Sequence, residues 1–265
     1  MTKTCKILTA IGLLLLAAAL CLTVYNLRSD TAARRSADAV LAQLTPELEE
    51  RVAAAEAGAS VPSAPGEAPA AAEETFLPDY LLDPEMEMPS EEIDGRSYIG
   101  VLCLPSLGLE LPVLGEWSDS GSRAAPCRYS GSAYLDTMVI AGHNYSGHFG
   151  TLKNLAPGDA LSFTDIDGNV FSYTVVELET LPPYAVEEMT SGDWDLTLFT
   201  CTVGGQSRLA VRCERAEAAA WPQNRIQPSV ESCRKRAFQP AVVCFFCNST
   251  DNLLIFSDFA DIMEP

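Results

Sequence analysis

The chain has 265 residues, a formal net charge of −19 at neutral pH and a pI near 4.3. A nucleic-acid-binding protein needs a basic face to displace phosphate counterions, so this charge balance excludes nucleic acid as the expected partner. The nine cysteines are odd in number and have no repeated spacing, which argues against a disulfide scaffold.

The first feature along the chain is an uncharged apolar run, Ile7 to Tyr25, which follows Lys3 and Lys6. The run is long enough to cross a bilayer, and the basic residues before it favour a cytoplasmic N-terminus. A cleaved signal peptide would have a shorter apolar core. We therefore expect residues 1–30 to form a cytoplasmic end and an uncleaved transmembrane anchor, with the later residues outside a Gram-positive-type cell membrane.

Residues 31–95 are expected to form an extracytoplasmic stalk and an acidic spacer rich in Ala and Pro. Thr45-Pro46-Glu47 predicts the start of a short helix, with Thr as N-cap and Pro at the first helical position. From Gly58 to about Ala72 the chain has too few large apolar groups to fold, which predicts a disordered spacer. A coil of roughly sixty residues would hold the next domain on the order of 45 Å from the bilayer.

A folded domain is expected over residues 96–215, where short β-rich runs are separated by Gly, Pro, Asn and Asp. The predicted strands are 97–104, 110–114, 137–141, 160–164, 170–178, 196–201 and 208–213. Asp167-Gly168-Asn169 predicts a hairpin between two of them. Seven or eight short strands with few helices predict a mainly β fold with a closed β-barrel. The tail, residues 216–265, shows no sustained period, and we assign it no role.

Cys201 ends the predicted strand 196–201 and precedes a glycine-containing loop. Alternation places Thr197, Phe199 and Cys201 on one face of that strand. A thiol at a strand end, beside a loop, can be reached by a substrate and can act as a nucleophile. A small buried hydrophobic side chain is the alternative role for such a cysteine, and the pattern leaves both roles open.

The sequence has two histidines, His143 and His148. His143 stands where the apolar strand 137–141 gives way to a loop, and catalytic groups are common at such positions. The two histidines do not predict a zinc site, because zinc needs at least three protein ligands and no nearby cysteine or carboxylate completes one. We expect no metal here, and we interpret His148 as an ordinary loop side chain.

Arg208 and Arg212 lie four residues apart in the predicted strand 208–213, so alternation places them on one face. An arginine beside a reacting carbonyl can stabilise the charge that develops on oxygen, because it stays protonated and donates from a fixed fork. The alternative is a solvated strand face carrying two ordinary surface arginines. These residues alone do not decide between the two roles.

Several of these segments resemble the motifs of sortases, which are cysteine transpeptidases. Leu198-Phe199-Thr200-Cys201 resembles the sortase Thr-Leu-x-Thr-Cys motif, and Ala141-Gly142-His143-Asn144 resembles the sortase histidine motif. The two motifs occur in the order that sortases have. The resemblance extends over roughly Tyr98 to Arg215.

The resemblance implies an eight-stranded β-barrel with Cys201 as nucleophile, His143 as proton carrier and Arg208 as oxyanion stabiliser. Arg208 matches better than Arg212, because the catalytic arginine of sortases lies near the start of the strand after the cysteine loop. No metal or organic cofactor is implied. Substrate contacts are expected at residues beside the catalytic ones, namely Ala141, Asn144, Thr200 and Thr202.

Sortases cleave the Thr–Gly bond of a C-terminal sorting signal such as Leu-Pro-x-Thr-Gly, and an amine then resolves the thioester. The implied partners are surface proteins or pilins that carry such a signal. The implied acceptor is a lipid-linked peptidoglycan precursor or a pilin lysine. The short segment Leu181 to Asp195 lacks the long helix of class B sortases, so it favours a class D-like over a class B-like enzyme.

Two alternatives stay open at this point. A cysteine peptidase would resolve the thioester with water, although papain-like peptidases place the cysteine before the histidine and this chain has the opposite order. A membrane-tethered β-barrel binding module would keep the fold without the chemistry.

Overall fold

The computed structural model describes residues 3–59 and 77–216, so the predictions for the remaining spacer, 60–76, and for the tail from 217 lie outside the described residues. The helices are α1 (Lys3–Ala59), α2 (Asp79–Leu82), α3 (Asp119–Ser122), the 3₁₀ helix η1 (Phe149–Asn154) and α4 (Val186–Thr190). The strands are β1 (Glu91–Ile93), β2 (Arg96–Leu104), β3 (Leu109–Leu114), β4 (Cys127–Ser130), β5 (Met138–Ala141), β6 (Ala160–Asp165), β7 (Val170–Leu181), β8 (Leu196–Cys201) and β9 (Arg208–Arg215).

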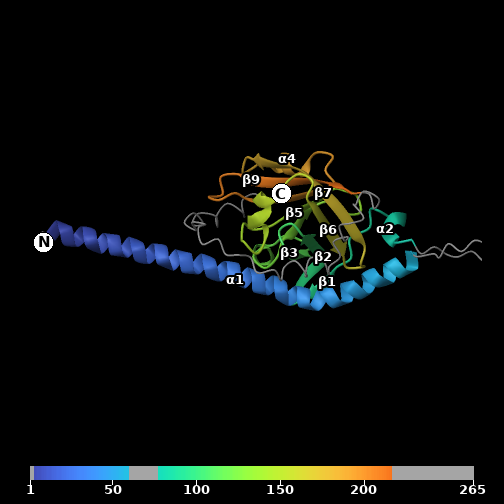
Figure 1. The fold of residues 1–265 in the computed structure, drawn as a ribbon, viewed down its shortest axis with the longest axis horizontal. Coiled ribbons are helices and arrows are strands. Elements are labelled where there is room, and N and C mark those ends of the chain that lie inside the picture. Colours follow the sequence, from blue (N-terminus) through green and yellow to red (C-terminus); the bar gives the residue numbers. More distant parts are fainter. Residues whose placement is uncertain (1–2, 60–76, 217–265) are drawn as a thin grey trace, which may run out of the picture.

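Strands β2 to β9 form a closed barrel (Figure 1). The strand order is β2-β3-β4-β5-β8-β9-β7-β6, and β6 pairs back onto β2 to close the ring. The prediction of a mainly β protein with an eight-stranded barrel is therefore confirmed. An additional strand, β1, pairs with the start of β2, so the sheet begins at Glu91, before the expected start at Arg96.

The seven predicted strands are present, and the hairpin predicted at residues 167–169 joins β6 to β7. Gly168 in that turn has a φ of +87°, a left-handed conformation that glycine adopts without steric cost. Strands β1 and β4 were not predicted. Each has only three or four residues, too few to show a period, and β4 pairs with β3 at a single position.

The barrel interior is a hydrophobic core in which Phe149, Phe163, Phe171 and Tyr173 are each at most 1% exposed. Burial of side chains of this size contributes roughly 2–3 kcal/mol each. A smaller apolar cluster, which includes Phe199 and the α4 residue Met189, covers the outer face of β5, β8 and β9. Because both faces of these strands are covered, every residue of β5 and β8 is buried.

Helix α1 runs without interruption over 57 residues, with Pro46 inside it. The predicted helix start at Thr45-Pro46-Glu47 is therefore wrong. A proline inside a helix removes a hydrogen bond and bends the axis, and α1 changes direction as it passes beneath the barrel (Figure 1).

The reason for the longer helix is tertiary packing, which the local pattern did not reveal. One face of α1 is buried at intervals of three or four residues, at Ala33, Ala37, Val40, Leu44 and Leu48. This face packs with residues of the barrel wall that include Tyr98, Val101 and Ala125. The segment 31–59 is thus helical and docks on the barrel over residues 33–48, and the coil separation of about 45 Å does not describe it.

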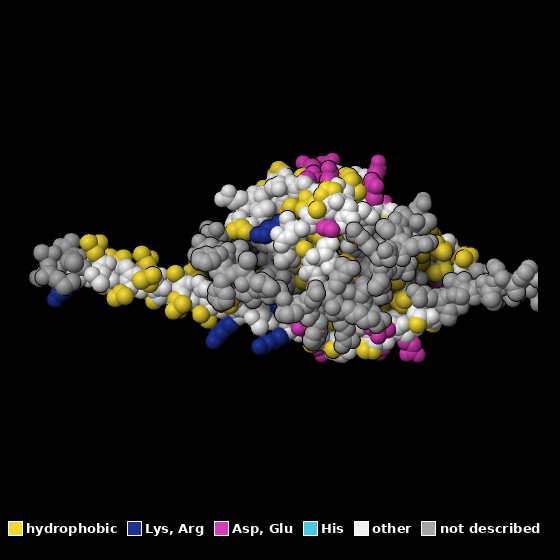
Figure 2. Space-filling model, viewed as in Figure 1, with side chains coloured by type: hydrophobic (Ala, Val, Ile, Leu, Met, Phe, Trp, Pro, Cys, Tyr) yellow, Lys and Arg dark blue, Asp and Glu magenta, His cyan; other side chains and the backbone are white. Residues whose placement is uncertain are grey.

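The N-terminal part of α1 extends beyond the barrel and carries hydrophobic side chains along its length (Figure 2). Among the described residues, α1 is the helix that is long and apolar enough to cross a membrane by length and composition. Within the part of the chain that the structure describes, no contact buries its apolar portion.

Candidate active site

Cys201 is the last residue of β8 and a free thiol that is 3% exposed. The predicted alternation is confirmed, because Leu196 and Leu198 point into the barrel core whereas Phe199 belongs to the outer cluster. Cys201 shares the outer face with Phe199. The thiol therefore sits on the outside of the barrel wall, at the end of a strand.

The turn after Cys201 directs the chain back along β8. Gly204 and Gly205 both have positive φ, at +84° and +71°, and Gly205 N–H donates to the Thr202 carbonyl at 2.9 Å. A Cβ on either glycine would have open space around it, so the requirement is for the backbone conformation. The Thr202 hydroxyl closes the turn through Ser207 Oγ at 2.8 Å.

Arg208 lies directly opposite Cys201 in the antiparallel β8–β9 ladder. Side chains at opposed positions project from the same face with Cβ atoms about 5 Å apart. Arg208 is 1% exposed, and its Nη1 donates to the carbonyls of Gly205 and Ser207 at 3.1 and 3.3 Å. The turn thus holds the guanidinium beside the thiol.

His143 comes level with Cys201 on the other neighbouring strand. Strand β5 is parallel to β8 with Ala141 opposite Phe199, and each catalytic candidate stands two residues further on. Gly142 N–H donates to the Phe199 carbonyl at 3.1 Å, so the pairing of the β5 and β8 segments extends to the residue directly before His143. The structure therefore brings the predicted residues to one edge of the barrel, with His143 in the loop just after β5, Cys201 at the end of β8 and Arg208 at the start of β9.

The ring of His143 has neighbours on both sides. Its Nε2 lies 3.3 Å from Ser122 Oγ, and its ring centroid lies 5.0 Å from that of Tyr145. The residue directly before His143 is Gly142, and a larger residue would not fit there, because its Cβ would approach the Phe149 ring to 2.5 Å. The sequence does not indicate Ser122, because a single serine that lies 21 residues before His143 forms no recognisable pattern with it.

Two other cysteines of the barrel are held in the neutral form by their surroundings. Burial raises the pKa of the Cys127 thiol to about 12 and raises that of Cys213 even further above its ordinary range. Both are free thiols. A nucleophile must be a thiolate, so neither side chain is suited to attack at neutral pH.

His148 is buried completely, which the interpretation as an ordinary loop side chain did not predict. Burial, followed by the nearby charge of His143, lowers the pKa of His148 from near 6.5 to about 4. It is therefore uncharged at neutral pH. Within residues 3–59 and 77–216, no group of three or more His, Cys, Asp and Glu side chains is placed to hold a metal ion.

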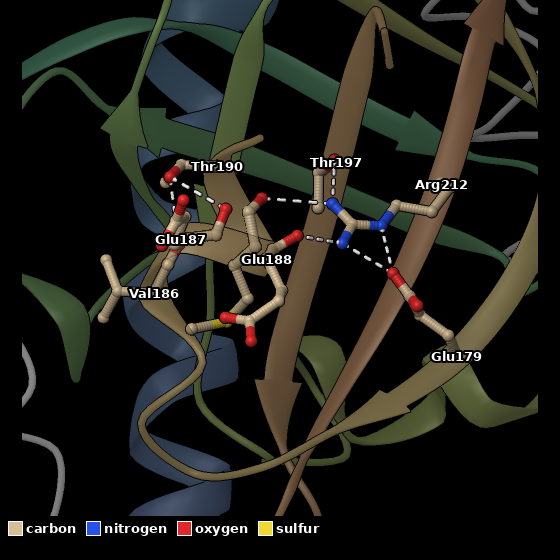
Figure 3. A network of polar contacts seen from close by, with 8 residues as sticks. Glu179, Val186, Glu187, Glu188, Thr190, Thr197 and Arg212 are labelled. Atoms are coloured by element: carbon tan, nitrogen blue, oxygen red, sulfur yellow. Dashed lines mark hydrogen bonds and ion pairs between the residues drawn. The ribbon is translucent and has the colours of Figure 1, made fainter. Parts of the chain in front are cut away.

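Arg212 is also buried, so the alternative of a solvated face with two surface arginines is wrong. Its guanidinium donates to Glu179 Oε1 at 2.6 Å, to Thr197 Oγ1 at 3.0 Å and to the backbone carbonyls of Glu188 and Met189 (Figure 3). These contacts join α4 to β7, β8 and β9. Arg212 therefore fixes α4 to the barrel beside the site, whereas Arg208 lies opposite Cys201.

The residues expected to bind substrate lie around this edge in different settings. Ala141 is buried in the outer cluster, and Asn144 and Thr202 are half-buried in the two loops. Thr200 is 2% exposed and alternates with Cys201, so its side chain faces the barrel interior. A substrate on the outer face would meet the Thr200 backbone.

Known proteins share similarity with the barrel region of this chain. A family model described as the sortase domain matches residues 102–216. Sortase A of Bacillus anthracis is 29% identical over 121 residues, and the match spans 43% of this chain and 57% of that protein.

The solved structures to which the chain is similar include two sortases. Sortase C1 from Streptococcus agalactiae is 24% identical with a TM-score of 0.42, covering 48% of this chain and 71% of that chain. Sortase C from Clostridium perfringens is 21% identical with a TM-score of 0.41, covering 67% and 89%. From the family model and the curated relative, the conclusion is that residues 102–216 of this chain are similar to the sortase domain.

Proposed function

We propose that this protein is a membrane-anchored cysteine transpeptidase in which Cys201 attacks the Thr–Gly bond of a C-terminal sorting signal. The observation that carries the proposal is the alignment of His143, Cys201 and Arg208 at one edge of three adjacent strands. The match of residues 102–216 to the sortase domain supports the same chemistry.

The roles follow from the positions of the three side chains. The Cys201 thiolate attacks the scissile carbonyl, and Arg208, opposite it on β9, donates hydrogen bonds to the oxyanion that forms. His143 then protonates the departing amine, which leaves a thioester on Cys201. An acceptor amine attacks the thioester, gives up a proton to His143 and restores the thiolate.

The substrate class comes from the family resemblance. We propose that the donor is a surface protein or pilin with a signal similar to Leu-Pro-x-Thr-Gly, and that the acceptor is a lipid-linked peptidoglycan precursor or a pilin lysine. Ala141, Asn144, Thr202 and the Thr200 backbone are the proposed substrate contacts. The five-residue α4 before β8 supports a class D-like enzyme over a class B-like one.

The proposed location is the outer face of the cell membrane. The apolar part of α1 would span the bilayer, with Lys3 and Lys6 on the cytoplasmic side.

The test is mass spectrometry of labelled C-terminal signal peptides incubated with the full-length protein, with and without an added amine. Transfer requires an amine-dependent product and an acyl adduct on Cys201 that Cys201→Ala lacks. Product that forms equally without amine would indicate a cysteine peptidase. Absence of any adduct across a pentapeptide library would instead favour the non-enzymatic binding module.

A further inference from the structure

The anchor helix contacts the turn that follows the proposed catalytic histidine. Asp30 Oδ2 accepts a hydrogen bond from Ser146 Oγ at 2.6 Å, and Asp30 Oδ1 accepts one from Gly147 N–H at 3.3 Å. Arg34, one turn further along α1, donates to the same Ser146 Oγ at 2.9 Å. Asp30 and Arg34 are themselves an ion pair at 3.8 Å.

The close approach depends on a glycine at the centre of the contact. A Cβ on Gly147 would lie 2.2 Å from Arg34 Cγ, so a larger residue there would push the turn away from the helix. Gly147 is accordingly buried. The absence of a side chain lets α1 reach the turn backbone directly.

Backbone hydrogen bonds connect the turn at residues 144–148 to His143. Phe149 N–H donates to the His143 carbonyl at 3.1 Å, and the Tyr145 carbonyl accepts from His148 and Gly150 at 3.0 and 2.8 Å. The side-chain rings of this segment are also close to one another, with centroid distances of 5.0 Å from His143 to Tyr145 and 5.6 Å from Tyr145 to His148. A shift of the 144–148 turn would therefore move the His143 ring.

A second connection links α1 to the other side of His143. Ser122, which lies 3.3 Å from His143 Nε2, is followed closely by Ala125. Ala125 packs in one cluster with Val40 and Leu44 of α1. Helix α1 thus contacts both the 144–148 turn and the segment that follows Ser122, which are the two neighbours of the His143 imidazole.

We propose that Asp30, assisted by Arg34, is a positioning residue that sets the His143 imidazole for proton transfer, so that the anchor helix forms part of the catalytic framework. This inference rests on the proposed function, because it assigns His143 the proton transfer. Asp30 follows the apolar run by five residues, or about 8 Å of helix. The contact is therefore placed near the surface of the bilayer that α1 would span.

The test compares matched variants of the full-length protein in lipid nanodiscs. Asp30→Ala removes both acceptors, whereas Asp38→Ala removes an exposed acidic residue of the same helix. Arg34→Ala and its exposed neighbour Arg35→Ala form a second matched pair. Turnover and KM are measured on one peptide and one amine, and thermal melts exclude unfolding.

A second readout does not depend on activity. The chain has two histidines, so isotope labelling of histidine gives NMR signals from His143 and His148 alone, and His148→Gln assigns them. We expect Asp30→Ala to shift the His143 signals and to lower kcat by about tenfold to a hundredfold, as small misplacements of a catalytic group do. KM should stay within about twofold, because the contact orients the imidazole and does not bind the peptide.

The proposal is overturned if Asp30→Ala keeps both kcat and the His143 signals, or if Asp38→Ala changes them equally. A wild-type protein with no turnover would contradict the proposed function. In that case the NMR comparison of Asp30→Ala with Asp38→Ala still decides whether Asp30 positions His143.

Discussion

Cys201 and Arg208 occupy directly opposed positions of the β8–β9 ladder, joined by a turn whose carbonyls hold the guanidinium. This register distinguishes the two arginines of β9, which alternation alone did not separate. Arg212, four residues further along the strand, lies opposite Thr197 and donates to Glu179 and to carbonyls of α4. The two side chains are equally buried, but their different neighbours predict different losses on mutation.

Substitution of Arg208 should act mainly on turnover. Arg208→Ala and Arg208→Lys are both expected to lower kcat by about a hundredfold to a thousandfold, because lysine keeps the charge but loses the planar fork. Turnover on one peptide, with thermal melts of each variant, provides the measurement. Recovery of activity in Arg208→Lys would show that charge alone suffices.

Substitution of Arg212 should act mainly on stability. Arg212→Ala leaves the carbonyls of Glu188 and Met189 without their donor, and we expect a loss of about 2–4 kcal/mol in the free energy of unfolding. Urea titration followed by circular dichroism measures the loss, with Glu179→Ala as a milder comparison because that side chain is a third exposed. If Arg212→Ala unfolds normally but loses turnover while Arg208→Ala retains it, the two roles must be exchanged.

Thiol labelling should single out Cys201 among the free cysteines of the barrel. The alkylation rate of a thiol rises about tenfold per pH unit below its pKa, because only the thiolate reacts. The pKa of about 12 for Cys127 leaves that residue essentially unreactive at pH 7, and Cys213 is held even more strongly in the neutral form. Peptide mapping after brief iodoacetamide treatment should find adducts on Cys201 before either control. Faster labelling of Cys127 or Cys213 would assign the reactive thiol differently.

Docking of α1 on the barrel predicts a stability cost for truncating its buried leucines. Leu44 and Leu48 are each 1% exposed, and Leu→Ala at such sites costs about 2–5 kcal/mol. Glu50→Ala, an exposed substitution on the same helix, serves as the control. Chemical unfolding of the three variants gives the comparison. Equal stability of Leu44→Ala and Glu50→Ala would show that the helix does not dock in solution.

The sequence was sufficient for the strands whose alternation extends over five or more residues. The family motifs predict Cys201, His143 and Arg208 as site residues, and the structure brings these three together at one edge of the barrel. The sequence did not predict the docking of α1, because the apolar face at Ala33, Ala37 and Val40 is built largely from small residues in a chain rich in alanine. Composition indicated a spacer, whereas the long-range contact with the barrel wall makes the segment helical.

Contacts between distant segments account for the other failures of prediction. The sequence leaves Arg212 open as a surface residue because its partners, Glu179 and the α4 carbonyls, lie far from it in sequence. The sequence likewise predicts an ordinary loop side chain for His148, because the burial of His148 depends on elements packed around the loop. A pattern along one strand cannot reveal which segments cover it.

The buried His148 predicts acid sensitivity of the fold. Its pKa is about 4 in the folded protein and near 6.5 when unfolded, so the unfolded chain binds more protons between these values. Stability is therefore complete above about pH 6.5 and is lost as pH falls towards 4, by on the order of 3 kcal/mol for this one group. The groups that act on it are His143, Asp30, Arg34 and the Ala124 backbone, with burial as the dominant cause.

His148→Gln should flatten the difference in unfolding free energy between pH 7 and pH 4.5 relative to wild type, measured by urea titration at both values. An unchanged pH dependence in His148→Gln would show that the imidazole is accessible to protons in the folded state and that its burial does not hold it neutral.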